Sequence, residues 1–198
     1  MTDNKIITDR EEMLEAIKND PWALQYADNT LKADREFALE AVRLNLNGLQ
    51  YVDETLWADR KFVLEAVRLD NQALSFADKT LKADREVVLE SLTNWDLALQ
   101  YADDSLKADR EVVLAAVKLN QGHALQYADD SLKADREVIL TAVKDNIKQV
   151  NGGALKYADK TLWVDREFVL EVVKMSGSIL QYADSSLKTD PEIVFEAV

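Results

Sequence analysis

Arginine and aspartate side chains recur at fixed spacing in this sequence, and a guanidinium can pair with a carboxylate through two parallel hydrogen bonds. The arginines stand in an Asp-Arg-acid motif, with Lys61 in place of the acid after Arg60, and a second set of aspartates ends segments of the type Ala-Leu-x-Tyr-Ala-Asp. We expect the two sets to pair as a structural ladder. The alternative is a groove that presents guanidinium groups to an acidic peptide or a phosphorylated partner. The proposed ladder contains Arg35, Arg60, Arg85, Arg110 and Arg136 with Asp53, Asp78, Asp103 and Asp129.

Adjacent acids and the single histidine are weaker candidates for chemistry. Asp103 and Asp104 lack the alternating acids around a central glycine that a calcium loop needs, and neighbouring side chains at a helix end diverge. Carboxylate catalysis needs two acids in one cleft, whereas the repeat spreads its acids over the surface. His123 is the only histidine and there is no cysteine, which argues against two-histidine zinc sites and excludes thiolate chemistry. We therefore expect no enzyme activity, no cofactor and no metal.

An aromatic row and a glutamine row recur in the Ala-Leu-x-Tyr-Ala-Asp segments. We expect the aromatic side chains to lie in the core, with hydroxyl groups that reach backbone carbonyls, and not to form a binding platform. The aromatic row is Tyr26, Tyr51, Phe76, Tyr101, Tyr127, Tyr157 and Tyr182. The glutamines fall on the outward face, so they are the best contact candidates, with a plain solvated face as the alternative. The glutamine row is Gln25, Gln50, Gln100, Gln126 and Gln181.

Residues that break the repeat pattern form a further set of candidates. Trp57 and Trp163 replace a lysine of other repeats, so each is either a lid over the core or an exposed binding anchor, and both remain candidate contacts. Trp22 and Trp95 stand in connections between helices. Residues 145–153 contain an insertion that includes Asn151, and insertions in repeat proteins often collect on a binding face.

The elements that position these residues are tandem repeats of about 25 residues. Seven units and the start of an eighth follow one another, and the chain opens with the tail of a preceding unit. We expect one elongated domain over residues 1–198, because a repeat of this length packs only on its neighbours. The repeats begin at Asp9, Asp34, Asp59, Asp84, Asp109, Asp135, Asp165 and Asp190.

Each repeat predicts two helices. The aspartate is an N-cap, and Pro191 supports this because proline suits the first helical position. The apolar residues from Phe37 to Leu44, and their counterparts from Val112 to Leu119, predict a helix of about eleven residues that is buried on both flanks. We expect it to end near Asn45, Asp70, Asn94, Asn120 or Gly177. A second helix of about two turns then leads through a Ser/Thr-Leu-Lys-Ala turn, of 3₁₀ type, into the next cap.

These patterns predict an all-α solenoid, a superhelix of two-helix repeats with half-repeats at both ends. The units DREVVLAAV and ALQYAD resemble the tandem repeats of the family called domain of unknown function 4116, over nearly the whole chain. The resemblance is specific for the type of repeat. It implies no activity and no site residues, because the family has no assigned function.

The net charge of the chain limits the kinds of partner that it can bind. With 37 acidic and 24 basic residues the formal charge is −13, which repels nucleic acid and anionic lipid. No apolar run predicts a membrane span or secretory signal, so we expect a cytoplasmic protein, with export without a classical signal as the alternative. The apolar helix from Ile193 to Val198 suggests a longer array or end-to-end self-association. We predict a non-enzymatic scaffold that binds an unidentified protein or peptide; the alternative is a spacer or targeting segment of a longer bacterial protein.

Overall fold

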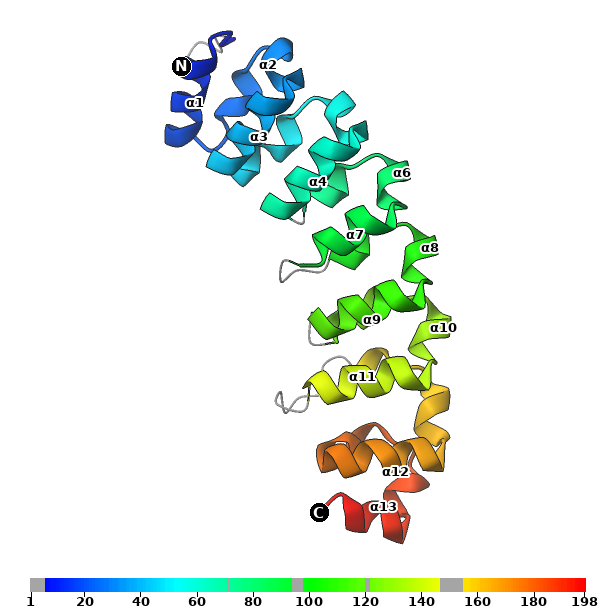
Figure 1. Cartoon of the computed structure of the whole chain (residues 1–198). Helices are drawn as coiled ribbons and strands as arrows, with labels where there is room; N and C mark the ends of the chain where they lie inside the picture. Colours follow the sequence, from blue (N-terminus) through cyan, green and yellow to red (C-terminus); the bar gives the residue numbers. More distant parts are fainter. Residues whose placement is uncertain (1–5, 71, 94–97, 120–121, 147–154) are drawn as a thin grey trace. The chain divides into compact units, whose positions relative to one another are not determined.

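The structure is a computed structural model that describes residues 6–70, 72–93, 98–119, 122–146 and 155–198 (Figure 1). Two compact units divide the chain, Met1–Asn94 and Trp95–Val198. Each unit is built from the same kind of repeat, which is a long helix followed by short helical pieces. The described residues form no strand beyond a single bridge between Ile7 and Ala27. The prediction of a helical tandem-repeat protein is therefore confirmed.

Each long helix begins one residue after a capping aspartate, as predicted; an acid follows at the second helical position in every case except the helix that begins at Arg60, where Lys61 stands. Asp34 accepts a hydrogen bond from the backbone N–H of Phe37 at 2.7 Å, and its charge also favours the positive end of the helix dipole. Pro191 stands in the first turn of its helix. The long helices of the first unit are α1 (Arg10–Asn19), α3 (Arg35–Leu44), α4 (Arg60–Leu69) and α7 (Arg85–Ser91). Those of the second unit are α9 (Arg110–Leu119), α11 (Arg136–Asn146), α12 (Arg166–Met175) and α13 (Pro191–Glu196).

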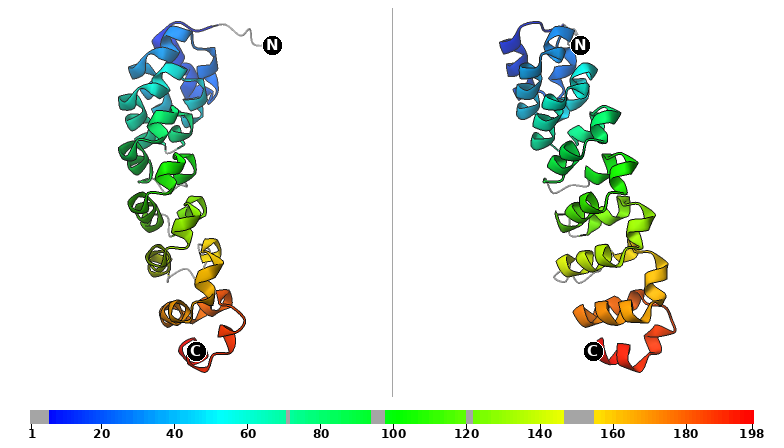
Figure 2. Two further views of the ribbon diagram at one scale, coloured as in Figure 1. Left: turned by 90° about the vertical axis from the view of Figure 1, so that its right-hand side faces the viewer. Right: turned by 45° about the vertical axis from the view of Figure 1, so that its right-hand side comes forward.

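Consecutive long helices pack against each other within each unit (Figures 1 and 2). In the first unit α3 contacts α1 and α4, and α4 contacts α7; in the second unit α11 contacts α9 and α12, and α12 contacts α13. Phe37, Phe62 and Phe168 are completely buried between these helices. Because a helix of ten residues is marginal by itself, each repeat depends on its neighbours for stability.

The buried stripe is shorter than predicted at its C-terminal end. Leu44 and Leu119 are 41% and 47% exposed, because each is the last residue of its helix and lies where the connection begins. Three of the predicted helix ends are close to the observed ones, while Asn94 and Asn120 lie outside the described residues. Asn45 and Asp70 are C-caps, and α12 ends with Ser176 as its C-cap, one residue before Gly177.

The second segment of each repeat is broken into short pieces, so the prediction of one two-turn helix is wrong. Between η1 and α2 the residues Ala27 and Asp28 are extended, with ψ of 147° and 167°. Asp28 then caps α2 by accepting from the N–H of Leu31 at 2.8 Å, and an aspartate in this role favours a new helix start over a continued helix. The pieces in the first unit are η1 (Ala23–Tyr26), α2 (Asn29–Ala33), η2 (Leu46–Tyr51), η3 (Glu54–Ala58), α5 (Ala73–Phe76) and α6 (Lys79–Lys82).

The second unit shows the same break. Ala128 is extended after η5, and the side chain of Asp129 accepts from the N–H of Ser131 at 2.9 Å to start α10. The pieces in this unit are η4 (Ala98–Tyr101), α8 (Asp104–Lys107), η5 (His123–Tyr127), α10 (Asp130–Lys133), η6 (Leu155–Tyr157), η7 (Lys160–Val164), η8 (Gly177–Tyr182) and η9 (Leu187–Thr189).

Within each unit, backbone hydrogen bonds tie a second segment to the preceding one. The N–H of Asp53 donates to the carbonyl of Lys32 at 3.1 Å, and that of Asp78 donates to the carbonyl of Trp57 at 2.8 Å. The second unit repeats the bond at 2.9 Å from Asp129 to Lys107, from Asp159 to Lys133 and from Asp184 to Trp163. A continuous helix would use these N–H groups internally, so this ladder is a second reason for the break.

None of the helices that the structure describes combines the length and the apolar character needed to cross a lipid bilayer.

Candidate functional site

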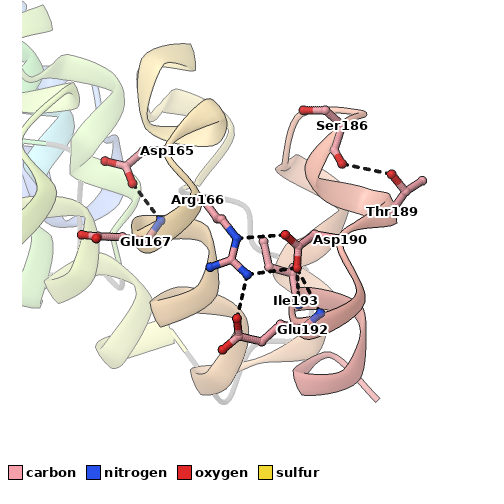
Figure 3. Close-up of polar contacts among 8 residues, drawn as sticks. All are labelled: Asp165, Arg166, Glu167, Ser186, Thr189, Asp190, Glu192 and Ile193. Atoms are coloured by element: carbon pink, nitrogen blue, oxygen red, sulfur yellow. Dashed lines mark hydrogen bonds and ion pairs between the residues drawn. The ribbon is translucent and has the colours of Figure 1, made fainter.

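The arginines of the Asp-Arg-acid motif pair with carboxylates of the next repeat. Arg166 donates from Nε to Asp190 at 2.9 Å and from Nη2 to Glu192 at 2.6 Å (Figure 3). Asp190 therefore caps α13 and binds a guanidinium at the same time. These carboxylates offset the unfavourable position of a cation at a helix N-terminus. The same arrangement joins Arg60 to Asp84 and Glu86, and Arg110 to Asp135 and Glu137.

A second arrangement places the guanidinium one turn further along the next helix. Arg136 donates to Glu171 at 2.9 Å, and its guanidinium carbon lies 5.8 Å from the ring centre of Phe168. Arg10 donates to Glu40 at 2.7 Å and lies 5.6 Å from the ring centre of Phe37. Arg35 pairs with Glu65 in the same way.

The third residue of the next helix distinguishes the two arrangements. Where this residue is Phe37, Phe62 or Phe168, the arginine donates to the glutamate one turn along, and Arg10 also lies 3.7 Å from the capping Asp34. Where it is Val87, Val138 or Ile193, the arginine donates to the capping aspartate. The rings of Phe37 and Phe168 offer the guanidinium a face to stack on, which favours the glutamate one turn along. An aliphatic side chain leaves the cap as the nearest partner.

Arg35 is incompletely satisfied in this scheme. Its Nη2 pairs with Glu65, but its Nε is the one buried side-chain polar atom without a hydrogen-bond partner in the described part of the chain. The following helix has Lys61 where Arg60 and Arg110 find an acid in theirs. The acidic partner at that position is therefore missing for Arg35.

The predicted acidic half of the ladder is wrong. Asp53, Asp78, Asp103 and Asp129 do not appear as partners of the arginines; each caps the short piece that follows it. Asp53 accepts from the Thr55 N–H at 3.0 Å and from the Thr55 hydroxyl at 2.5 Å, which lowers the pKa of Asp53. Each repeat has two regularly placed aspartates, one that caps a short piece and one that caps the next long helix. In the folded chain, Arg60, Arg110 and Arg166 lie close to the aspartate that caps the next long helix. Arg85, at the start of α7, is exposed.

Ion pairing also changes the acidity of the capping aspartates. The guanidinium of Arg60 lowers the pKa of Asp84, and the guanidinium of Arg166 lowers the pKa of Asp190. The N–H groups of the first helical turn act in the same direction. These carboxylates are therefore held ionised, which suits structural pairing more than proton transfer.

The glutamine row lies on the second segments, at the surface. Gln50 and Gln181 are exposed, while Gln25, Gln100 and Gln126 are half-buried. Gln126 links two repeats, because it donates to the carbonyl of His123 at 3.2 Å and accepts from the hydroxyl of Tyr157 at 3.2 Å.

The aromatic row is less buried than predicted. Its six tyrosines are half-buried and Phe76 is 38% exposed, because these side chains stand at the edge of the second segments. The hydroxyl of Tyr157 donates to a glutamine side chain and not to a backbone carbonyl.

The two tryptophans that replace lysine are lids over the core and not exposed anchors. Trp57 is 5% exposed and packs on Phe62 and Phe76 at ring-centre distances of 5.1 and 5.3 Å. Trp163 is 7% exposed and packs on Phe168 and Tyr182 at 5.6 and 5.5 Å. Burial removes both indoles as direct partner contacts, and each lies where a phenylalanine occupies the third position of the next helix.

The remaining candidate residues stand, in the sequence, between the long helices and in the last helix. Asn151 and Trp95 lie outside the described residues. Trp22 is 46% exposed, and His123 is exposed at the start of η5. Within the ranges that the structure describes, no three acids or histidines gather as a metal site. The last helix, α13, buries Ile193 completely and leaves Phe195 80% exposed.

Sequence reasoning missed one feature, a notch beside Trp57. Trp57 and Phe76 depart from the lysine and tyrosine of most repeats, and the available signal was their occurrence beside the acid Glu54.

Comparison with known proteins finds one family. The family described as "Domain of unknown function (DUF4116)" matches residues 9–57, 34–82, 59–107, 84–121, 109–163 and 165–198. No curated protein and no solved structure matches the chain. The overlapping segments follow the repeats from the first capping aspartate to the last residue, so the chain belongs to the DUF4116 family.

Proposed function

We propose that this chain is a non-enzymatic scaffold, folded as an α-solenoid superhelix, that binds a protein or peptide along its second segments. The glutamine row supplies the contacts, with Gln50 and Gln181 as the exposed members. Amide side chains can donate to and accept from an extended backbone, which suits recognition of a peptide.

The observation that supports this proposal best is the backbone ladder between second segments. Bonds from Asp53 to Lys32 and from Asp78 to Trp57 hold consecutive segments of the first unit at one register. Equivalent outward positions therefore recur at a regular interval within the unit. A repeated row of this kind is how repeat proteins bind extended partners.

Affinity capture with matched variants tests the proposal. Gln25→Arg with Gln50→Arg adds two positive charges on the row and blocks amide pairing. Glu11→Gln with Glu36→Gln changes the net charge by the same amount on exposed positions of α1 and α3. We expect the glutamine variant to lose proteins that the wild type and the glutamate variant both retain.

The opposite result is equally informative. If all three proteins capture the same partners in the same amounts, the glutamine row is not the contact surface. Capture of nothing specific by the wild type would favour the spacer or targeting role. Circular dichroism of each variant controls for loss of the fold.

A further inference from the structure

A notch opens beside Trp57 in the first unit. It has a volume of about 320 Å³, and it lies between η3 and the segment that follows α5. Aromatic and acidic groups share its walls. The lining residues are Glu54, Thr55, Trp57, Ala58, Phe76 and Asp78.

Four other repeats fill the position of Trp57 with a lysine that is paired within the chain, namely Lys32, Lys82, Lys107 and Lys133. Where the residue three positions earlier is acidic, the lysine binds it: Lys107 lies 2.9 Å from Asp104, and Lys133 lies 3.0 Å from Asp130. Lys32 and Lys82 instead donate to the backbone carbonyls of residues 25 and 75, at 2.8 and 2.7 Å. The repeat thus normally supplies its own cation at this place.

The repeat that contains Glu54 lacks that cation. Trp57 stands where the lysine partner of Glu54 would be, and Glu54 forms no ion pair with any residue that the structure describes. The carboxylate is exposed. An acid without its usual lysine therefore borders the notch.

The walls of the notch suit a cation. Phe76 is 38% exposed and stacks on Trp57 with 26° between the rings, so the buried indole supports the exposed phenyl ring. The N–H of Asp78 donates to the carbonyl of Trp57 at 2.8 Å and holds the two sides together. The hydroxyl of Thr80 lowers the pKa of Asp78, which keeps this second carboxylate charged. An aromatic surface between two carboxylates attracts an ammonium or guanidinium group.

We propose that this notch binds a lysine or arginine side chain from a basic segment of a partner protein, which takes the place of the missing internal lysine. This inference rests on the proposed scaffold function and names the chemistry of the partner. The net charge of −13 favours the approach of such a segment.

The second unit provides a matched control. Trp163 packs on Phe168 and Tyr182 much as Trp57 packs on Phe62 and Phe76. The position of Glu54, however, is occupied there by Lys160. A positive charge beside Trp163 repels the group that Glu54 attracts.

Titration of the full-length ¹⁵N-labelled chain with a tetralysine peptide tests the notch. We expect the indole N–H resonance of Trp57 to shift with a saturable curve at low salt, and that of Trp163 to shift little. Glu54→Gln should weaken the apparent affinity at Trp57 by about threefold, whereas Glu11→Gln should not, because it removes an equal charge elsewhere. Lys160→Glu should create a saturable response at Trp163.

Equal responses at Trp57 and Trp163, or an unchanged affinity for Glu54→Gln, would overturn the notch as a cation site. The titration needs no natural partner, so it can fail while affinity capture still supports the scaffold. A scaffold whose captured partners bind Glu54→Gln as well as wild type would likewise keep its function and lose this site.

Discussion

At the residue scale, the third position of each long helix selects the partner of the preceding arginine. Phe168 accompanies the pair between Arg136 and Glu171, and Val138 accompanies the pair between Arg110 and Asp135. Arg136 and Arg110 each bind a carboxylate, so the choice between these two geometries depends on whether a ring is available to stack on. The surface is thereby tied to the core, because the same phenylalanine is completely buried.

Phe168→Val should move Arg136 from Glu171 to the cap of α12. The ring that supports the first geometry is lost, and Asp165 with Glu167 then offers the arrangement seen beside Val138. A double-mutant cycle between Arg136 and Glu171, measured by urea unfolding, should give a coupling of up to about 1 kcal/mol in the wild type and about zero in the Phe168→Val background.

The cycle has an internal check. Phe168→Val also removes buried volume and should lower overall stability by about 1–3 kcal/mol, which the cycle subtracts. A coupling between Arg136 and Glu171 that survives the substitution would mean that the ring does not choose the partner.

The capping aspartates make the stability of the fold depend on pH. Arg60 lowers the pKa of Asp84, so the folded state binds its proton more weakly than the unfolded state, in which the value is about 3.9. Their contribution is present above about pH 4 and is lost as the pH falls through the lower folded-state pKa. We expect the melting temperature to fall between pH 5 and pH 2, with a shallower fall for Asp84→Asn, which keeps the cap. Parallel curves for the two proteins would refute this role of Asp84.

At the element scale, the long helices could be predicted and the second segments could not. Asp34 and Pro191 announce helix starts through local chemistry that acts within one turn. The break after Ala27 depends on a bond between repeats, from the N–H of Asp28 to the carbonyl of Ile7 at 3.0 Å. Periodicity within one repeat contains no information on such a bond.

The candidate site could be predicted only in part for the same reason. The repetition identified the arginine row, but each repeat has two aspartates, and only the packing of neighbours shows which one the guanidinium reaches. The sequence left two interpretations of Trp57 open, an anchor or a lid. Its burial depends on contacts with Phe62 and Phe76, which come from different elements and are brought together only by the fold. Glu54 became a candidate for cation binding only when its repeat was seen to lack the lysine that pairs with the equivalent acids.

Two glycines should respond differently to alanine. A Cβ at Gly177 would lie 2.0 Å from the carbonyl oxygen of Ala197, whereas a Cβ at Gly48 would meet only the side chain of Leu24, at 3.0 Å. Backbone cannot give way as a leucine methyl can. We expect Gly177→Ala to cost about 1–3 kcal/mol and to increase hydrogen exchange in α13, and Gly48→Ala to change stability by less than about 1 kcal/mol.

Hydrogen exchange by mass spectrometry, together with urea unfolding, measures both effects. Equal losses of stability for the two variants, or unchanged exchange in α13 for Gly177→Ala, would show that the approach of residue 177 to residue 197 does not hold this helix.

At the scale of the whole molecule, the two units use one repeat chemistry with different exceptions. Each contains a buried tryptophan in place of lysine, but only the first joins it to an acid, at Glu54. The shared positions hold neighbouring repeats together through caps, arginine pairs and the backbone ladder. Positions that differ between repeats are therefore the ones free to acquire specificity, which is the usual division in repeat proteins.

Site-specific photo-crosslinking tests directly whether a partner protein binds along the second segments. A benzoylphenylalanine at position 50, on the exposed part of the glutamine row, is compared with the same group at position 36, which is exposed on α3 of the same repeat. We expect a discrete crosslinked protein from position 50 and none from position 36. Crosslinks to the same protein from position 36 alone, or none from either position with a partner that affinity capture recovers, would contradict binding along the second segments.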